Sequence, residues 1–442
     1  MVVTEASLVP ILRRLIPGLS IYTAGNSNFQ DCLHFYNHAL DEQPLVCVKP
    51  VIDQEVAQVI QFCNTSGIPF SVRSGGHDFF GRSLVKGGVL IDMRAIDSII
   101  VEPGRASARV GGGVIAGTLQ ESLGSQGLFT PTGQTNTVGY ILGARVVLAG
   151  GQIVNTDQEP ELLWALRGAG AGTFGIVTEL RVKVYPVPDL YAGLLAFPLS
   201  DAAAVMDRID KLLDEDFPDE FSGDAIAAHP EMVPIPVSEP CLVLFWCWTM
   251  TNGGLAPAKG FLDQMVQAGK VLGNTVSETT PAAYGAGDTS SPTFVRSRSI
   301  DRMQHKVGAV LARQPPPYPM SIVIFHNNHG KGVRDGIADE VGAVFANRYK
   351  HVILGFHGGT KSGSVEAQDV SNAATWVTEL RDAIDQDGLS LQGGFPSFFP
   401  PGQVDLEQFF GAQGATRLRR LKARLDPDNI FCHSLPGLGQ AK

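Results

Sequence analysis

The sequence predicts an α+β fold, and three observations lead to that prediction. The chain has 442 residues, which exceeds one typical hydrophobic core and favours two or three domains. Its 50 glycines, 44% apolar residues and 18% charged residues are typical of a compact α/β protein and not of a disordered or fibrous chain. Short strands and helices alternate up to Pro186, whereas strand-like runs with few tight hairpins dominate after it.

Charge and hydropathy disfavour several classes of partner. The net charge of −10 at pH 7, without a basic run to offset it, argues against binding to nucleic acid or to an anionic membrane. No stretch is apolar and long enough to span a bilayer, and residues 1–15 lack the pattern of a signal peptide, so we expect a cytoplasmic protein. The six cysteines show no C-x-x-C spacing, which predicts free thiols and no metal site.

The N-terminal half is organised around a turn with the sequence Ser-Gly-Gly-His at residues 74–77. A buried strand at 44–50 and an amphipathic helix at 53–63 precede a second strand that ends at this turn. Because glycine adopts backbone conformations closed to other residues, consecutive N–H groups of the turn can converge on an anion, and Arg73 adds positive charge. The turn therefore predicts a site for a phosphate or pyrophosphate.

The remaining elements of this half lead to a second glycine-rich loop. We expect helices at 7–15 and 28–40, a strand at 88–93, a hairpin turning at Pro103-Gly104, a helix at 113–124, a hairpin at 144–154 and a helix at 157–167. The glycines of 168–175 then follow a helix and precede a strand, the reverse of the order in a Rossmann fingerprint. They predict close approach of the backbone to a flat ligand.

After residue 187 the pattern indicates an antiparallel sheet backed by helices. The expected strands are 191–198, 240–249, 319–325 and 351–356, and the expected helices are 202–213, 256–268 and 373–384. A basic helix at 416–425 and the sequence D-P-D-N-I-F at 426–431 then close the chain. We expect domains at 1–186, with parts at about 1–76 and 77–186, and at 187–400, followed by a returning segment at 401–442.

Three motifs together resemble one family. R-S-G-G-H at 73–77, L-R-G-x-G-x-G-x-F-G-I-V at 166–177 and D-P-x-N-x-F at 426–431 are similar to those of the berberine-bridge-enzyme-like branch of the vanillyl-alcohol-oxidase superfamily. The resemblance extends from about residue 21 to 431. It implies a two-part FAD-binding domain of the PCMH type and a substrate domain built on the C-terminal sheet.

The resemblance also implies that FAD is tethered through His77 to the 8α-methyl carbon of the flavin. A neutral imidazole, with a reference pKa of about 6.5, is a competent nucleophile for such a bond; the alternative is that His77 only caps a turn. The residues that the resemblance assigns to the cofactor are Arg73, Ser74, Gly75, Gly76, His77, Asp78, Gly81, Gly133, Thr135, Thr137, Val138, Gly139, Gly172, Thr173, Gly175, Ile176, Val177 and Asn429.

The sequence departs from the family pattern at three places. Thr135 stands where doubly tethered members have a cysteine, so no second, cysteinyl link is expected. The family has a further glycine-rich loop between positions equivalent to Gly139 and Ala144, which this sequence lacks, and such a deletion should weaken cofactor binding. The active-site Tyr-x-Asn of many members corresponds to residues 395–397 (Phe-Pro-Ser), so the usual phenol cannot serve as the base.

His326 is the candidate that we favour for the missing base. It follows the apolar strand 322–325, and strand alternation lets only one of His326 and Asn327 point inward. A histidine there can accept a proton near neutral pH, although an exposed loop containing His326 and His329 is an equally good interpretation. Other candidates are Tyr140 and His357 for catalysis, and Asn328, Phe395 and Ser397 for contact with the substrate.

The resemblance favours an FAD-dependent oxidase. Such an enzyme takes a hydride from a small-molecule alcohol or amine, such as an intermediate of secondary metabolism, and passes the electrons to O₂ to give H₂O₂. The alternatives are a flavoprotein that catalyses oxidative cyclisation, and a non-redox cyclase or binding protein whose flavin is structural or lost. The expected partners are the substrate and O₂, and the expected state is a monomer or homodimer.

Overall fold

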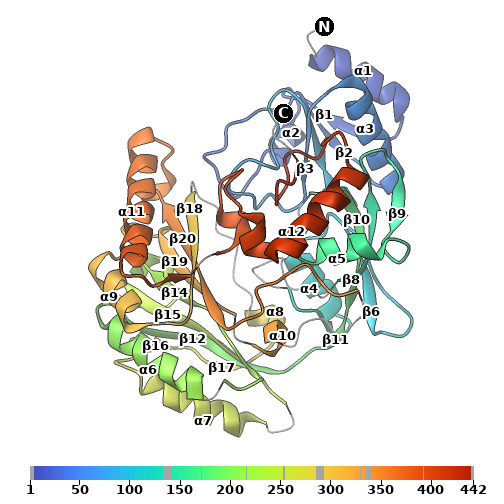
Figure 1. Cartoon of the computed structure of the whole chain (residues 1–442). Coiled ribbons are helices and arrows are strands. Elements are labelled where there is room, and N and C mark those ends of the chain that lie inside the picture. The colour runs from blue at the N-terminus through green and yellow to red at the C-terminus, as the bar shows by residue number, and fades with distance from the viewer. Residues whose placement is uncertain are drawn as a thin grey trace.

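The computed structural model describes residues 4–132, 141–170, 172–215, 217–251, 254–284, 293–328, 330–334, 341–391 and 393–439. In Figure 1 the N-terminal part, up to residue 186, lies on the right in blue and cyan. The C-terminal sheet and its helices, in green to orange, lie on the left. The last helix, in red, returns to the N-terminal part, and both chain ends lie there.

The first sheet of the N-terminal part has four strands in the order β1-β2-β4-β3. The strands are β1 (Ser20–Tyr22), β2 (Val46–Lys49), β3 (Phe70–Arg73) and β4 (Val89–Asp92), and the helices beside them are α1 (Glu5–Leu15) and α3 (Asp53–Ser66). Strand β4 pairs in parallel with β2 and β3. Acidic Asp53 and Glu55 suit the first turn of α3, which ends at Gly67 in the left-handed conformation. The predicted β-α-β unit is confirmed.

The helix predicted at 28–40 is wrong, because α2 covers only Ser27–Cys32. The guanidinium of Arg73 explains the early end. It donates hydrogen bonds to the main-chain carbonyls of Asp31 and His34, which a longer helix would use internally. Phe35 then packs into a buried cluster with Phe29 instead of continuing the helix.

The second sheet of the N-terminal part has the order β5-β6-β10-β8-β9, and its printed pairs are antiparallel. Its elements are β5 (Ile99–Val101), β6 (Ser107–Gly111), β8 (Ile141–Val147), β9 (Ile153–Asn155) and β10 (Ile176–Lys183), with helices α4 (Ala116–Gly124) and α5 (Pro160–Ala169). A short pair, β7 (Leu128–Phe129) and β11 (Tyr185–Pro186), lies beside it. Both predicted hairpins and the helix-loop-strand order around residues 168–175 are confirmed.

The C-terminal sheet is antiparallel, with the main order β16-β12-β15-β14-β19-β20-β18-β21. Its strands are β12 (Leu190–Pro198), β13 (Phe221–Ser222), β14 (Ala225–Ala228), β15 (Cys241–Thr249), β16 (Gly273–Asn274), β17 (Ser277–Thr279), β18 (Thr293–Ile300), β19 (Ile322–Asn328), β20 (His351–Gly359) and β21 (Ser390–Leu391). Helices α6 (Ala202–Glu215), α7 (Leu255–Val266), α9 (His305–Arg313) and α11 (Ala367–Gln386) bury the apolar core on one face. The predicted sheet backed by helices is confirmed.

The face of the C-terminal sheet away from these helices is turned toward the N-terminal part (Figure 1). Two short helices, α8 (Pro281–Tyr284) and α10 (Lys331–Arg334), lie on this side. Strand alternation assigns side chains to the two faces: Phe325 and Phe356 belong to the helix-covered core, and their neighbours along β19 and β20 face the other way.

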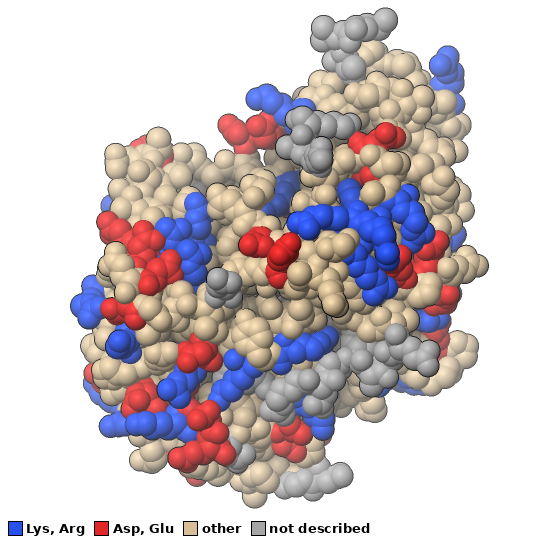
Figure 2. Space-filling model, in the orientation of Figure 1, with Lys and Arg blue, Asp and Glu red and all other residues tan. Residues whose placement is uncertain are grey.

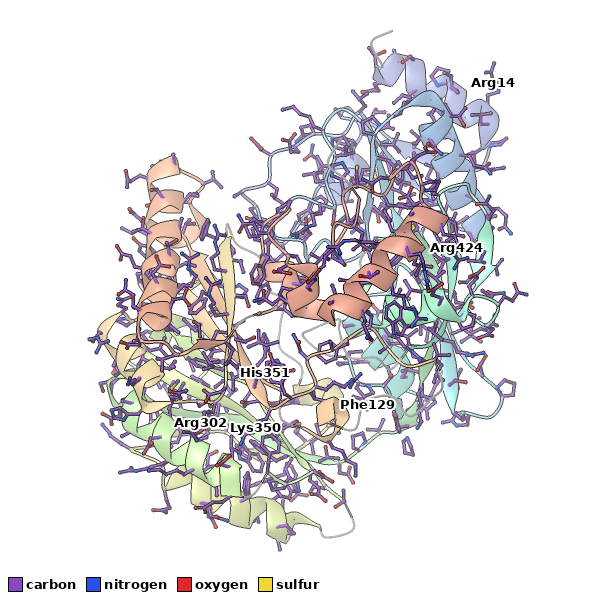
Figure 3. All side chains as sticks on the ribbon, in the orientation of Figure 1. Arg14, Phe129, Arg302, Lys350, His351 and Arg424 are labelled. Carbon is purple, nitrogen blue, oxygen red and sulfur yellow. The ribbon has the colours of Figure 1, made fainter. Side chains whose placement is uncertain are left out.

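Helix α12 (Leu406–Leu425) begins earlier than predicted and packs on α5. Three of its arginines are paired: Arg417 lies 3.1 Å and Arg420 3.2 Å from Glu161, and Arg424 lies 3.2 Å from Glu159. Figure 2 shows this group on the outer face, where blue and red atoms adjoin, and Figure 3 labels Arg424 there. In the described ranges no helix is long and apolar enough to cross a membrane.

Candidate functional site

The Ser-Gly-Gly-His turn directly follows β3. Gly76 has φ +75°, and a Cβ there would lie 3.1 Å from the carbonyl oxygen of His34, so both conformation and space require glycine. The main-chain N–H groups of residues 74–78 donate to no acceptor among the described residues. Such a run of unpaired amides is the backbone arrangement that binds a pyrophosphate.

The turn lies against the second glycine-rich motif. The hydroxyl of Ser74 donates to the carbonyl of Gly112 at 3.2 Å, and Gly112 in turn donates to the carbonyl of Thr178 on β10 at 2.9 Å. A Cβ on Gly175 would lie 2.5 Å from the carbonyl oxygen of Val147, so the loop before β10 can only approach β8 this closely with glycine. The structure therefore brings together two motifs about 100 residues apart, which contain many of the residues assigned to the cofactor.

His77 is exposed and stacks on Tyr36, with ring centroids 5.2 Å apart. Tyr36 also donates its main-chain N–H to the carbonyl of Gly76 at 2.9 Å, so one residue supports both the turn and the imidazole. The next residue, Asp78, accepts hydrogen bonds from Arg82 at 3.1 Å and from the N–H of Ser83 at 3.3 Å. Asp78 therefore shapes the loop after the histidine.

Arg73 is placed differently from the expectation. Its side chain is 2% exposed, and besides the two carbonyls at the end of α2 it contacts Asp92 at 3.5 Å. Burial acts to raise the pKa of Asp92, but hydrogen bonds from Arg94 hold it below its ordinary value. The guanidinium of Arg73 thus holds the end of α2 and Asp92 in place through buried contacts. The main-chain amides of the turn remain as the groups that can contact an anion.

A group of Cys32, Cys47 and Asp92 lies beneath the turn and is compact enough to hold a metal ion. All three are buried. The guanidiniums of Arg73 and Arg94 already contact the carboxylate and would repel a further cation. We therefore assign no metal to this group.

Two residues assigned to the cofactor, Thr173 and Asn429, also hold the C-terminal segment in place. The Thr173 hydroxyl donates to the carbonyl of Leu435 at 3.0 Å. Asn429 has φ +49° in a turn closed by its N–H donating to the carbonyl of Asp426 at 3.1 Å. Buried Asp426 accepts from Lys422 at 2.7 Å and from the N–H groups of residues 430 and 431. The D-P-x-N-x-F motif is therefore a structural turn.

Some predicted residues lie outside the described part of the chain. They are Gly133, Thr135, Thr137, Val138, Gly139 and Tyr140 from the segment before β8, and His329 after β19. Their assignments stay predictions. The remaining cofactor residues lie in the two motifs or shortly after the first: Gly81 and Gly172 have positive φ in turns, and Ile176 and Val177 pair with β8.

His326 lies inside regular strand β19 and is 7% exposed, so the interpretation as an exposed loop residue is wrong. Its register opposite Ile353 puts it on the face turned toward the N-terminal part. Its Nδ1 lies 2.6 Å from Oδ2 of Asp224, the residue before β14. Asp224 was not foreseen from the sequence, because nothing around it repeats or alternates and it is distant from His326 in the chain.

A group of aromatic rings joins the two halves of the site. The imidazole of His357 lies edge-on to Phe79 at 5.5 Å and to Phe398 at 4.9 Å. Phe79 follows the Ser-Gly-Gly-His turn and contacts Tyr36 at 5.3 Å. Burial, with a smaller contribution from His326, lowers the pKa of His357 to about 3, so this histidine is neutral near pH 7.

The predicted substrate residues lie beside these groups. Asn328 donates its amide to the carbonyl of His326 at 3.2 Å. Phe395 is buried, and its N–H donates to the hydroxyl of Ser297 at 2.8 Å. Ser397 is half-buried in a single 3-10 turn, in which Phe398 is the residue that reaches His357. The aromatic run at 395–399 could have indicated this role.

Comparisons with known proteins agree with this geometry. A family model described as "FAD binding domain" matches residues 44–152, and one described as "Berberine and berberine like" matches residues 402–436. An FAD-linked oxidoreductase, aurO, of Gibberella zeae is 28% identical over 448 residues, covering 94% of this chain and 85% of the relative. The (R)-6-hydroxynicotine oxidase of Paenarthrobacter nicotinovorans is 30% identical over 239 residues, covering 47% and 52%.

Solved structures show the same fold. The 6-hydroxy-D-nicotine oxidase of Arthrobacter nicotinovorans superposes with a TM-score of 0.79 at 21% identity, covering 94% of this chain and 97% of that one. Berberine bridge enzyme of Eschscholzia californica gives a TM-score of 0.80 at 15% identity, covering 98% and 100%. The fold, the two adjoining glycine-rich motifs and the matched models thus identify the chain as a berberine-bridge-enzyme-like, FAD-linked oxidoreductase of the vanillyl-alcohol-oxidase (PCMH-type FAD-binding) superfamily.

Proposed function

We propose that this protein is an oxidase that takes a hydride from a small-molecule alcohol or amine, returns the electrons to O₂ as H₂O₂, and carries its FAD on His77. The observation that supports this most is the run of main-chain amides at residues 74–78, which have no acceptor among the described residues and lie beside the exposed imidazole of His77. Bound FAD supplies the hydride acceptor. The protein's part is to hold the cofactor and substrate and to accept a proton.

The residues of the turn fit the cofactor in two ways. The amides of 74–78 can bind the pyrophosphate, and Gly175 lets the loop before β10 pack closely on β8, next to the strand that contacts Gly112. The stacking of His77 on Tyr36 holds the imidazole beside the turn. A single link at His77 follows, because Thr135 offers no thiol.

His326 is the proton acceptor in this proposal. It lies on the sheet face turned toward the N-terminal part, and its Nδ1 is engaged by Asp224, which leaves Nε2 for the substrate. The imidazole can accept the substrate proton at Nε2, so it can replace the phenol that Phe395 lacks.

Acid precipitation of the purified protein tests the link. The wild-type pellet should stay yellow, and intact mass should equal 47.2 kDa plus one FAD. His77→Ala should release the flavin into the supernatant, whereas His38→Ala, an exposed histidine nearby, should not. A colourless wild-type pellet would show that the link is absent.

Peroxide release under air tests the reaction. We would use (R)-6-hydroxynicotine and chitooligosaccharides as first amine and alcohol probes, because proteins similar to this one are named for oxidising them, together with benzylic alcohols and amines. Flavin bleaching under nitrogen followed by peroxide on admission of air supports an oxidase. Bleaching without peroxide excludes O₂ as the acceptor, and protein purified without flavin favours a non-redox function.

A further inference from the structure

The carboxylate of Asp224 is held at both oxygens. Oδ2 lies 2.6 Å from Nδ1 of His326, and Oδ1 accepts the main-chain N–H of Asn327 at 3.2 Å. The main chain around Asp224 is fixed as well, because its carbonyl accepts the N–H of Phe245 at 2.8 Å and the Asn327 amide donates to the carbonyl of Gly223 at 2.8 Å. The carboxylate therefore has one orientation relative to the imidazole.

This contact decides which ring nitrogen of His326 carries the proton. A carboxylate only accepts hydrogen bonds, so Nδ1 of a neutral imidazole must be the donor, and the lone pair lies on Nε2. Among the described residues, Nε2 has no hydrogen-bond partner. A proton from a bound substrate would thus be accepted at Nε2 while Nδ1–H stays on Asp224.

Neighbouring histidines lack this arrangement. His357, from β20, contacts phenylalanine rings, and His351 has its Nδ1 2.7 Å from the carbonyl oxygen of Tyr349. Burial lowers the pKa of both. The other titratable groups near the pair are Tyr284 of α8 and Cys247 of β15, and burial raises the pKa of both, so each is neutral near pH 7.

We propose that Asp224 is the positioning residue of the reaction: it fixes His326 in the Nδ1–H tautomer and stabilises the imidazolium that forms when Nε2 accepts the substrate proton. This inference rests on the proposed function. For an alcohol, the hydrogen on carbon leaves with its electron pair to the flavin, the O–H electron pair becomes the second bond of the carbonyl, and the proton ends on Nε2. An amine yields an imine in the same way.

Asp224→Asn provides a test without any substrate. The N–H of Asn327 requires an oxygen at the Oδ1 position, so the new NH₂ group faces His326 and donates to Nδ1. The imidazole must then carry its proton on Nε2. The ¹⁵N NMR spectra of histidine-labelled protein, with His326→Gln to assign the signals, should show the Nδ1–H tautomer in the wild type and the Nε2–H tautomer in Asp224→Asn. The same tautomer in both proteins would overturn the proposal.

Anaerobic flavin reduction provides the kinetic test, with whichever probe the peroxide assay identifies. Asp224→Asn should slow reduction by about 100- to 10,000-fold at unchanged flavin content, as expected when a base is held in the wrong tautomer. The double variant with His326→Gln should be no slower than the slower single variant, and Asp224→Glu should recover part of the rate. The rate of the wild type should fall at acid pH with the protonation of one group, and this limb should disappear in His326→Gln.

The matched control is Asp219→Asn, which makes the same change in an exposed carboxylate paired with Lys331 at 3.3 Å. It should leave the rate and the tautomer unchanged. Equal rates in Asp224→Asn and the wild type would overturn the inference and leave the oxidase intact. A wild type that no probe reduces, with the expected tautomers in the spectra, would instead count against the proposed function alone.

Discussion

His357 and His326 lie on one sheet face but have different surroundings. His326 pairs with a carboxylate, whereas His357 is enclosed by Phe79 and Phe398. Nε2 of His357 has no hydrogen-bond partner among the described residues. A neutral imidazole with such a nitrogen can form a hydrogen bond to an uncharged group. Of these two histidines, only His326 pairs with a carboxylate in the described part of the chain, that of Asp224.

We predict that His357 makes the fold sensitive to acid. Its folded-state pKa, about 3, lies below the reference value of about 6.5, so its contribution to stability is complete above pH 6.5 and is lost as the pH falls toward 3. The free energy of unfolding from urea titrations should fall by about 3 kcal/mol more between pH 7 and 4 in the wild type than in His357→Gln. Exposed His305→Gln is the control. Parallel pH profiles for His357→Gln and the wild type would contradict the prediction.

The sequence contained enough to locate His77 and His326 but not their partners. Both histidines stand at the ends of recognisable patterns, a Ser-Gly-Gly turn and an apolar strand. Asp224 and Phe398 reach them only through pairing of distant strands, which residue order does not encode locally. Arg73 was correctly placed near the turn, yet the side on which its guanidinium lies depends on packing against α2.

At the scale of elements, most long helices and the apolar strands were predictable, whereas α2 was predicted too long, α9 was missed and mixed strands were not predicted. Strand β18 escaped notice because arginine and serine alternate along it at residues 296–299. Both of its serines are buried, and Ser297 donates to the carbonyl of Leu354 at 2.8 Å. On the opposite face of the strand, Arg298 donates to Asp385 of α11 at 3.0 Å. Polar partners in the folded protein thus replace the apolar pattern that signals a strand.

Helix α6 provides a second pH-dependent prediction. Asp210 on this helix is 9% exposed, and burial raises its pKa to about 6 despite Arg302 and Lys350, which are labelled near one another in Figure 3. A carboxyl with a raised pKa favours the fold below its unfolded value of about 3.8, and this contribution is lost as the pH rises through 6.

Asp210→Asn should therefore raise the free energy of unfolding by about 1 kcal/mol at pH 8 and leave it nearly unchanged at pH 4. Urea titrations at the two pH values provide the measurement. Asp207→Asn, at a half-buried position on the same helix that pairs with Lys211, is the control and should show no gain in stability at pH 8. An equal effect of Asp210→Asn at both pH values would rule out titration of Asp210 as the cause.

At the scale of the whole molecule, the C-terminal segment completes the N-terminal part. Phe431 is 5% exposed within the core around α3 and meets Phe70 edge-on at 5.8 Å. The buried pair of Lys422 and Asp426 fixes the turn before it. The return of the chain could be foreseen from the closing motif. The domain boundaries that we expected stay predictions.

Breaking this pair should destabilise the N-terminal part. Asp426→Asn removes the charge that compensates buried Lys422, and loss of one partner of a buried ion pair costs about 3 kcal/mol. Thermal unfolding followed by circular dichroism should show a lower midpoint for Asp426→Asn. Asp428→Asn, exposed in the same motif, should melt like the wild type, and equal midpoints for the two variants would show that the pair is not important for stability.

The position of Phe431 also bears on how the protein is made. The core that supports β3 and the Ser-Gly-Gly-His turn includes Phe431, which follows β4 by more than 300 residues in the sequence. During synthesis this residue is still inside the ribosome when β1 to β4 have long emerged. We therefore expect the flavin to be incorporated only after residue 431 has left the ribosome, and ribosome-bound chains stalled before this residue to bind no FAD.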